Sequence, residues 1–139
     1  MTSMVNPILF YHPDGYGMAR KDIKGRHSAG EGFLSAFLAQ TPHTEVHALC
    51  SEADHFKSFA QVVADSGRRL QARHVARADI AAMQRQGMIN LPDPMIGQEA
   101  IYRGFAGETS YAISGVTHTI SSRAILEAIA GLCVAPLIA

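Results

Sequence analysis

The sequence predicts an α/β fold, with a Rossmann-like parallel sheet of about five strands and helices on both faces. Short apolar runs of strand length alternate along the chain with longer stretches whose apolar residues recur at helical spacing. Strands separated by helices pair in parallel, because each helix carries the chain back to the edge where the previous strand began. The 139 residues, 47% of them hydrophobic, are enough for one domain with its own core.

The first strand is predicted at Pro7–His12, a continuous apolar run typical of a strand buried on both faces. A polar loop containing several glycines is expected from Pro13 to about Ser28, which is long for a strand-to-helix connection. The first helix is predicted at Ala29–Gln40, where Phe33, Leu34, Phe37 and Leu38 share one face.

The rest of the chain repeats this alternation. Further strands are predicted at residues 45–50, 70–75, 88–91 and 111–116, the 70–75 strand being the more exposed one. Further helices are predicted through residues 56–64, from 77 to 86, at 98–105 and from 123 to about 134. Ser51 or Asp54 is expected to cap the second helix, and Ser121 or Ser122 the last one.

Five strands connected in this way are expected in the order 3-2-1-4-5, with the first strand at the centre. Ligands of such sheets bind outside the carboxyl ends of the strands, near the point where the strand order reverses. The loops that follow Tyr11, Leu91 and Val116 are therefore the expected binding loops.

Composition narrows the functional classes. Lys and Arg number 12, and so do Asp and Glu, which gives no support for a nucleic-acid partner or a polybasic membrane contact. Cys50 and Cys133 stand alone in apolar segments, so we expect two unpaired, mostly buried thiols. With neither a signal-peptide pattern nor an apolar run of membrane-spanning length, the expected location is the cytoplasm.

Candidate binding residues follow the first and last strands. His12 follows the first strand directly, and Gly15 and Gly17 would let a ligand approach the backbone closely. His118 lies between two threonines after the last strand, where a histidine can orient a hydroxyl or accept a proton. Further along, Gly30 and Gly32 admit either a ligand or a neighbouring element of the fold.

Several motif-based classes find no support in the sequence. The glycines do not form a G-x-G-x-x-G or P-loop motif, so a dinucleotide or ATPase site is not expected. The seven histidines lack the close spacing of a zinc site, and we expect no metal. Ser114-Gly115 lacks the G-x-S-x-G pattern of an acyl-transfer nucleophile.

Four segments together resemble the amino-terminal, acceptor-side domain of bacterial retaining glycosyltransferases of the family 4-like group, which have two Rossmann-like halves (the GT-B fold). The segments are Asp14-Gly-Tyr16, Gly25-Arg26 with Ala29–Leu34, Leu91–Pro94, and Tyr111–Thr119. The resemblance implies that residues 1–139 are one Rossmann-like domain, the amino-terminal half of a larger two-domain enzyme. The other half would bind the nucleotide and carry a pair of acids.

The resemblance also implies roles for individual residues. His118 would be the cleft histidine that contacts the transferred sugar and would act in catalysis. Gly15 and Gly17 would approach the donor diphosphate. The acceptor would contact residues of the binding loops and of the cation-containing first loop, which are His12, Tyr16, Arg26, Asp93 and Thr119.

The implied reaction moves a sugar from a nucleotide-sugar to a hydroxyl of a sugar or lipid acceptor, without a metal or other cofactor. The implied partner is the donor-binding half, and self-association through an uncovered apolar face is a further expectation. The alternative is a non-catalytic flavodoxin-like domain that binds a small phosphorylated ligand or a partner protein. A second Rossmann-like half with paired glutamates after Ala139 would decide for the enzyme.

Overall fold

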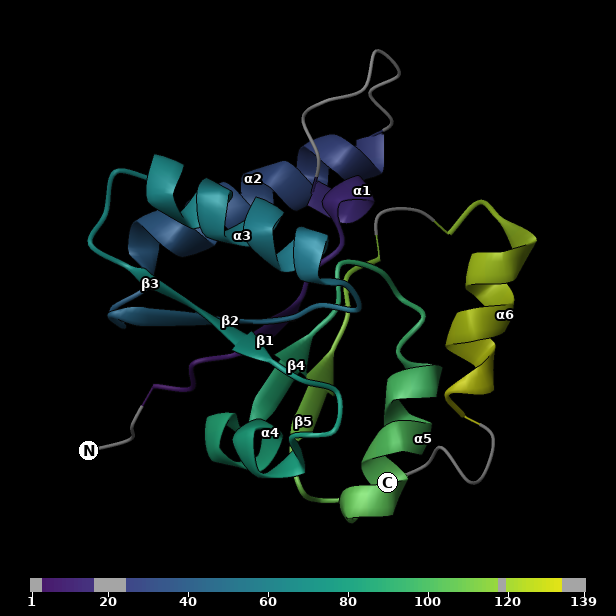
Figure 1. Ribbon diagram of the computed structural model, residues 1–139. Coiled ribbons are helices and arrows are strands. Elements are labelled where there is room, and N and C mark those ends of the chain that lie inside the picture. Colours follow the sequence, from purple (N-terminus) through teal and green to yellow (C-terminus); the bar gives the residue numbers. More distant parts are fainter. Residues whose placement is uncertain (1–3, 17–24, 118–119, 134–139) are drawn as a thin grey trace.

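Five parallel strands form one sheet in the order β3-β2-β1-β4-β5, the order predicted from the sequence (Figure 1). The computed structural model describes residues 4–16, 25–117 and 120–133. The strands are β1 (Ile8–Phe10), β2 (Glu45–Leu49), β3 (Gln71–Val75), β4 (Met88–Asn90) and β5 (Ala112–Ser114). Because β1 pairs with β2 on one side and β4 on the other, it is the central strand, as expected.

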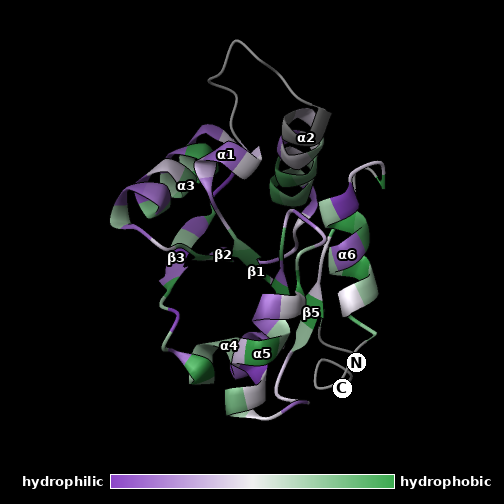
Figure 2. Cartoon of the chain, turned by 90° about the vertical axis from the view of Figure 1, so that its right-hand side faces the viewer, coloured by the Kyte–Doolittle hydropathy of each residue, from purple (hydrophilic) through white to green (hydrophobic). Residues whose placement is uncertain are grey.

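Helices cover both faces of the sheet, which confirms the predicted Rossmann-like α/β fold. Helices α1 (Pro13–Tyr16), α2 (Gly25–Gln40) and α3 (Ala53–Asp65) lie on one side in Figure 1, and α4 (Ile80–Gln86) and α5 (Gly97–Ala106) on the other. Helix α6 (Arg123–Gly131) follows β5 and lies at the same end of the sheet as α5 in Figure 1. Figure 2 shows the chain from that side.

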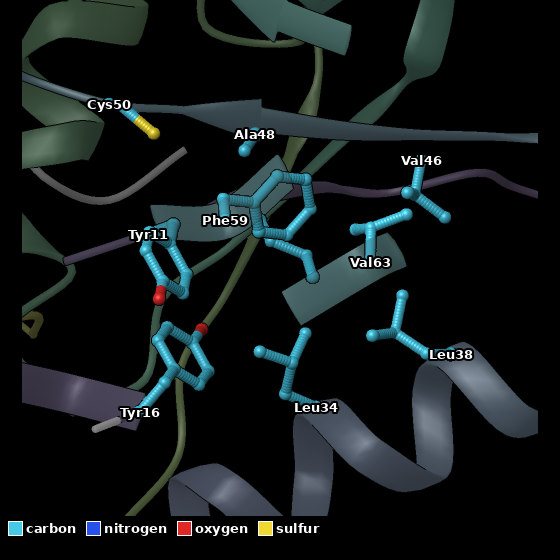
Figure 3. Close-up of a cluster of buried hydrophobic side chains, with 10 residues drawn as sticks. Tyr11, Tyr16, Leu34, Leu38, Val46, Ala48, Cys50, Phe59 and Val63 are labelled. Atoms are coloured by element: carbon cyan, nitrogen blue, oxygen red, sulfur yellow. The ribbon is translucent and has the colours of Figure 1, made fainter. Parts of the chain in front are cut away.

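The apolar run of β1 supplies both cores of the fold. Leu9 and Tyr11 pack with α2 and α3, whereas Ile8 on the opposite face packs with Met83 of α4 and with Ile89. Alternate residues of a strand point to opposite faces, so a strand covered on both sides is apolar at every position. Figure 3 shows the cluster under α2 and α3.

Helix ends are determined largely by local chemistry. The Asp79 carboxylate accepts a bond from the Ala82 N–H (2.9 Å), and Ser122 accepts one from the Ile125 N–H (3.3 Å). The cap expected from Ser51 or Asp54 is wrong, because Glu52 holds the N-cap position before α3 and makes no side-chain cap bond.

The segment predicted as one loop at 13–28 is partly helical. Pro13–Tyr16 forms the short helix α1, and α2 begins at Gly25 rather than at Ala29. The polar and glycine residues of this segment favour a loop. They nevertheless form α1, because Tyr16 at its end packs into the core and is only 4% exposed. Residues 17–24 lie outside the described part of the chain.

The two cysteines differ. Both are unpaired, as predicted, and Cys50 is buried. Cys133 is exposed, so its predicted burial is wrong, because α6 buries none of its side chains. Among the described residues, no helix combines the length and apolarity that a membrane crossing requires.

Candidate functional site

The candidate site lies at the carboxyl edge of the sheet, where the chain leaves β1 on one side of the reversal and β4 on the other. His12 to Tyr16 follow β1, and Leu91 to Pro94 follow β4. The two segments touch, since a Cβ placed on Gly15 would lie 3.3 Å from Cγ of Pro92. Two of the loops expected from the sequence are therefore brought together.

His12 is held by the turn that it begins. Its carbonyl oxygen accepts a bond from the Gly15 N–H (2.9 Å), and its Nδ1 accepts one from the Asp14 N–H (3.1 Å). Because Nδ1 acts as an acceptor, the neutral ring carries its proton on Nε2. The side chain is 47% exposed, so this N–H is available to a ligand hydroxyl.

A second histidine stands against the first. The ring of His55, from the first turn of α3, meets the ring of His12 edge to face, with centroids 4.4 Å apart. His55 Nε2 lies 3.7 Å from a carboxylate oxygen of Glu52, and its side chain is 15% exposed. Its Nδ1 is buried without a partner among the described residues. This pair offers two imidazoles for hydroxyl binding or proton transfer.

The β4 side of the site contributes amides, hydroxyls and a carboxylate. Asn90 Nδ2 donates to Ser114 Oγ (2.8 Å) across neighbouring strand ends. Asp93 accepts a bond from the Met95 N–H (2.8 Å), which orients its carboxylate within the turn after β4. Such uncharged and acidic groups can bind the hydroxyls of a polar ligand.

Tyr16 packs in the core rather than projecting freely into the site. Its ring stacks on Tyr11 with centroids 5.2 Å apart, and its hydroxyl donates to the Phe10 carbonyl at 3.5 Å. Burial raises the pKa of Tyr16 well above the usual range of a tyrosine, with smaller contributions from Asp93 and Tyr11. It therefore remains a neutral phenol whose hydroxyl is directed to the backbone of β1.

Two glycines let the surrounding segments approach closely. A Cβ on Gly30 would overlap the Gly15 carbonyl oxygen, so Gly30 allows α2 to rest on α1. A Cβ on Gly115 would lie 2.6 Å from the Asp93 carbonyl oxygen, so Gly115 brings the exit of β5 against the β4 loop. The sequence left open whether Gly30 makes room for a ligand or for a neighbouring element of the fold. The structure shows that it makes room for a neighbouring element, α1.

The structure describes some of the predicted site residues and not others. His12, Gly15, Tyr16 and Asp93 belong to the two touching segments described above. Gly17, His118 and Thr119 lie outside the described residues, and for Arg26 only the backbone, in the first turn of α2, is described.

Sequence reasoning missed His55. Its signal was its position just after the second strand, three residues into a helix at the same sheet edge as His12. Within the described residues, His, Cys, Asp and Glu side chains do not form a group of three able to hold a metal ion.

Comparison with known proteins gives no further assignment. No protein-family model, curated protein or solved structure matches this chain.

Proposed function

We propose that this chain is the acceptor-side domain of a retaining, nucleotide-sugar-dependent glycosyltransferase with two Rossmann-like halves. The observation that carries the proposal is the contact between the turn after β1, which begins with His12, and the loop after β4, which holds Asp93, at the reversal point of the sheet. A site of imidazoles, hydroxyls and one oriented carboxylate suits a ligand rich in hydroxyls.

In this proposal the domain acts by positioning. The Nε2–H of His12 donates to an acceptor hydroxyl, and Asp93 accepts from another, which fixes the attacking oxygen. His118 contacts the transferred sugar, Gly15 and Gly17 approach the donor diphosphate, and Arg26 and Thr119 complete the acceptor contacts. A second Rossmann-like half supplies the nucleotide contacts and the paired acids, and the reaction uses neither metal nor cofactor. The cytoplasm is the proposed location, where thiols such as Cys50 stay reduced.

The test is a nuclear magnetic resonance titration of the 139-residue chain with a panel of methyl glycosides and glycolipid headgroups. We expect saturable shifts confined to residues 12–16, 55, 90–93 and 114–117. His12→Ala should weaken binding at least fivefold, since it removes a ligand-facing N–H. His43→Ala is the matched control, because His43 lies before β2 at the opposite sheet edge, and it should change binding less than twofold.

Shifts that map elsewhere, or equal effects of the two substitutions, would contradict the acceptor site. We also expect the chain alone to transfer no sugar from any nucleotide-sugar, because the sequence holds no counterpart of the donor-binding half. Turnover above that of a heat-inactivated sample would contradict this division of labour.

The alternative, a domain that binds a partner protein, is favoured by one observation. Apolar side chains of α5 and α6 are exposed, among them Phe105 (86%), Ile101 (53%) and Leu126 (50%). Figure 2 views the molecule from the side of these two helices. The reading frame after residue 139 discriminates, because a second Rossmann-like half with paired glutamates belongs only to the enzyme.

A further inference from the structure

A cavity of about 520 Å³ opens between α2 and α3, on the sheet face opposite to α4. Its floor is made of side chains that are almost fully buried in the core, Tyr11 (3% exposed), Tyr16 (4%), Leu34 (3%) and Leu38 (2%). Figure 3 shows these four side chains, with the two tyrosine rings side by side and the two leucines rising from α2. The hollow therefore reaches down to the core instead of being a shallow surface groove.

The cavity exists because the facing stripes of the two helices carry short side chains. On α2 the stripe includes Ser35 and Ala39, four residues apart and thus on one face. On α3 it includes Ser58 and Val62, with the same spacing. Helices usually pack 8–10 Å apart with interlocking side chains, at a density that leaves few voids larger than water. The side chains of these two stripes are too short to fill the space between the helices.

The polar groups of the cavity fall into two sets. On the inner side, the hydroxyls of Tyr11 and Ser58 are hydrogen-bonded to each other (2.9 Å). Burial raises the pKa of Tyr11, so its hydroxyl stays protonated and can donate. At the rim stand two exposed carboxylates, Glu31 and Asp65, the second of which accepts a bond from Gln61 Nε2 (2.8 Å).

The charge of the rim is one-sided. Among the described residues that line the cavity, the charged ones are these two acids, and neither lysine nor arginine contributes. The nearby Arg68 guanidinium is occupied by the carbonyls of Leu38 and Ala39 at the end of α2 (3.0 and 3.1 Å). An apolar interior with an acidic mouth is complementary to an apolar group that ends in a cation.

We propose that this cavity binds a small amphipathic cation, an alkyl chain or aromatic ring that ends in an ammonium group. An engineered apolar cavity of about 150 Å³ accommodates benzene, and natural ligand sites span about 300–1,000 Å³. The volume of about 520 Å³ therefore suits a ligand larger than one ring. The apolar part lies on Tyr16, Leu34 and Leu38, and the ammonium lies at the rim, where Glu31 and Asp65 supply the negative charge.

This site goes beyond the proposed sugar transfer and does not depend on it. Pro13 and Tyr16 line the cavity and also belong to the segment after β1, but His12, His55 and Asp93 do not line it, so binding in the cavity and binding at the acceptor site are told apart at these three residues. In the acceptor titration, binding is detected as resonance shifts at residues 12–16, 55, 90–93 and 114–117. Binding in the cavity is detected at Ser35, Ala39, Ser58 and Val62, which belong to neither segment of the acceptor site.

The test uses three eight-carbon probes on the whole chain: n-octylamine, octanoate and 1-octanol, followed by magnetic resonance shifts and calorimetry below micelle-forming concentrations. We expect octylamine to saturate with shifts at Ser35, Ala39, Ser58 and Val62, and octanoate to bind at least fivefold more weakly. Absence of saturable shifts at these residues would overturn the site. Equal affinity for amine and carboxylate would overturn the cationic ligand.

Substitutions inside and outside the cavity distinguish the effect of filling it from a general disruption of α2. Ser35→Leu combined with Ala39→Leu should weaken octylamine binding at least tenfold, because the added side chains occupy the hollow. Ala36→Leu is the matched control, as Ala36 is exposed on α2 but does not line the cavity, and it should change binding less than twofold. Glu31→Gln with Asp65→Asn should reduce the preference for amine over carboxylate to less than twofold. Octylamine binding that survives the filled cavity would overturn the proposal.

Discussion

The two ends of the sheet are covered to very different degrees. On the side of β2 and β3, strands of five residues lie under α2 and α3, and Phe59 and Val63 of α3 are almost completely buried. On the side of β4 and β5 the strands have three residues, α5 buries only Glu99, and none of the α6 side chains is buried.

This difference shows that an amphipathic helix pattern does not guarantee burial. The sequence gives α6 an apolar side with Ile125, Leu126 and Ile129, much as it gives α3 Phe59 and Val63. Only α3 buries its apolar side against the sheet, because a five-residue strand offers more surface than a three-residue one. We therefore expect the β1–β3 end to contribute most of the stability.

The largest expected effect compares two phenylalanines. Phe59→Ala removes a ring that is 0% exposed and packs on Tyr11 and Phe56, and it should lower the free energy of unfolding by about 4 kcal/mol. Phe105→Ala, at a position 86% exposed on α5, should change it by less than about 0.5 kcal/mol. Urea unfolding followed by circular dichroism measures both, and similar losses would mean that the two ends are equally packed.

The next comparison concerns two ion pairs. Arg77 pairs with Glu99, whose side chain is 2% exposed, and also lies over the rings of Tyr102 and Phe10 at 4.7 and 5.6 Å. Glu99→Gln should cost about 2–3 kcal/mol, since it leaves the guanidinium without its buried counter-charge. The control is Glu127→Gln, which breaks the exposed pair with Arg123 and should cost less than about 0.5 kcal/mol.

Denaturant titrations at low and high salt sharpen this comparison. Raising the salt concentration should diminish the small Glu127 effect further and leave most of the Glu99 effect, because buried pairs are screened less. A Glu99→Gln protein as stable as the parent would show that this pair does not hold α5 to the turn after β3.

Two glycines of α2 offer a smaller, opposite pair of effects. Gly30→Ala should destabilise the fold by about 1–3 kcal/mol, because the new methyl group meets the backbone of Gly15. Gly32→Ala meets nothing within 4 Å and should instead stabilise by about 0.5–1 kcal/mol through helix propensity. Thermal unfolding of the two variants gives the signs directly. Stabilisation by both would show that α1 does not lie under α2 in solution.

The smallest effect is a pH dependence at His47. Burial lowers the pKa of His47, and the Glu45 carboxylate, 4.0 Å away, only partly opposes this. The unfolded chain, where histidine titrates near about 6.5, therefore binds the proton more readily. Stability should be complete above that pH and fall as the pH drops below it. His47→Gln should lose less stability than the parent between pH 7.5 and pH 5.5, and an unchanged loss would contradict the assignment.

By itself, the sequence determined the fold class, the strand order and most helix ends. These features depend on the period of apolar residues, on the handedness of crossovers and on caps such as Ser122, which are properties of one segment or of one strand–helix–strand unit. The failures are the helix α1, the start of α2, the cap of α3 and the burial of Cys133, where tertiary contacts override local preference.

Only the tertiary structure decided which side chains meet. His12 and His55, Arg77 and Glu99, and Gly15 and Gly30 come together from separate elements. The sequence places His12 and His55 at one sheet edge, but no pattern in it shows which side chains touch. The cavity between α2 and α3 is of the same kind, since each helix alone shows an ordinary apolar stripe. Packing depends on the volumes that two surfaces bring to one place, and that sum exists only once the chain has folded.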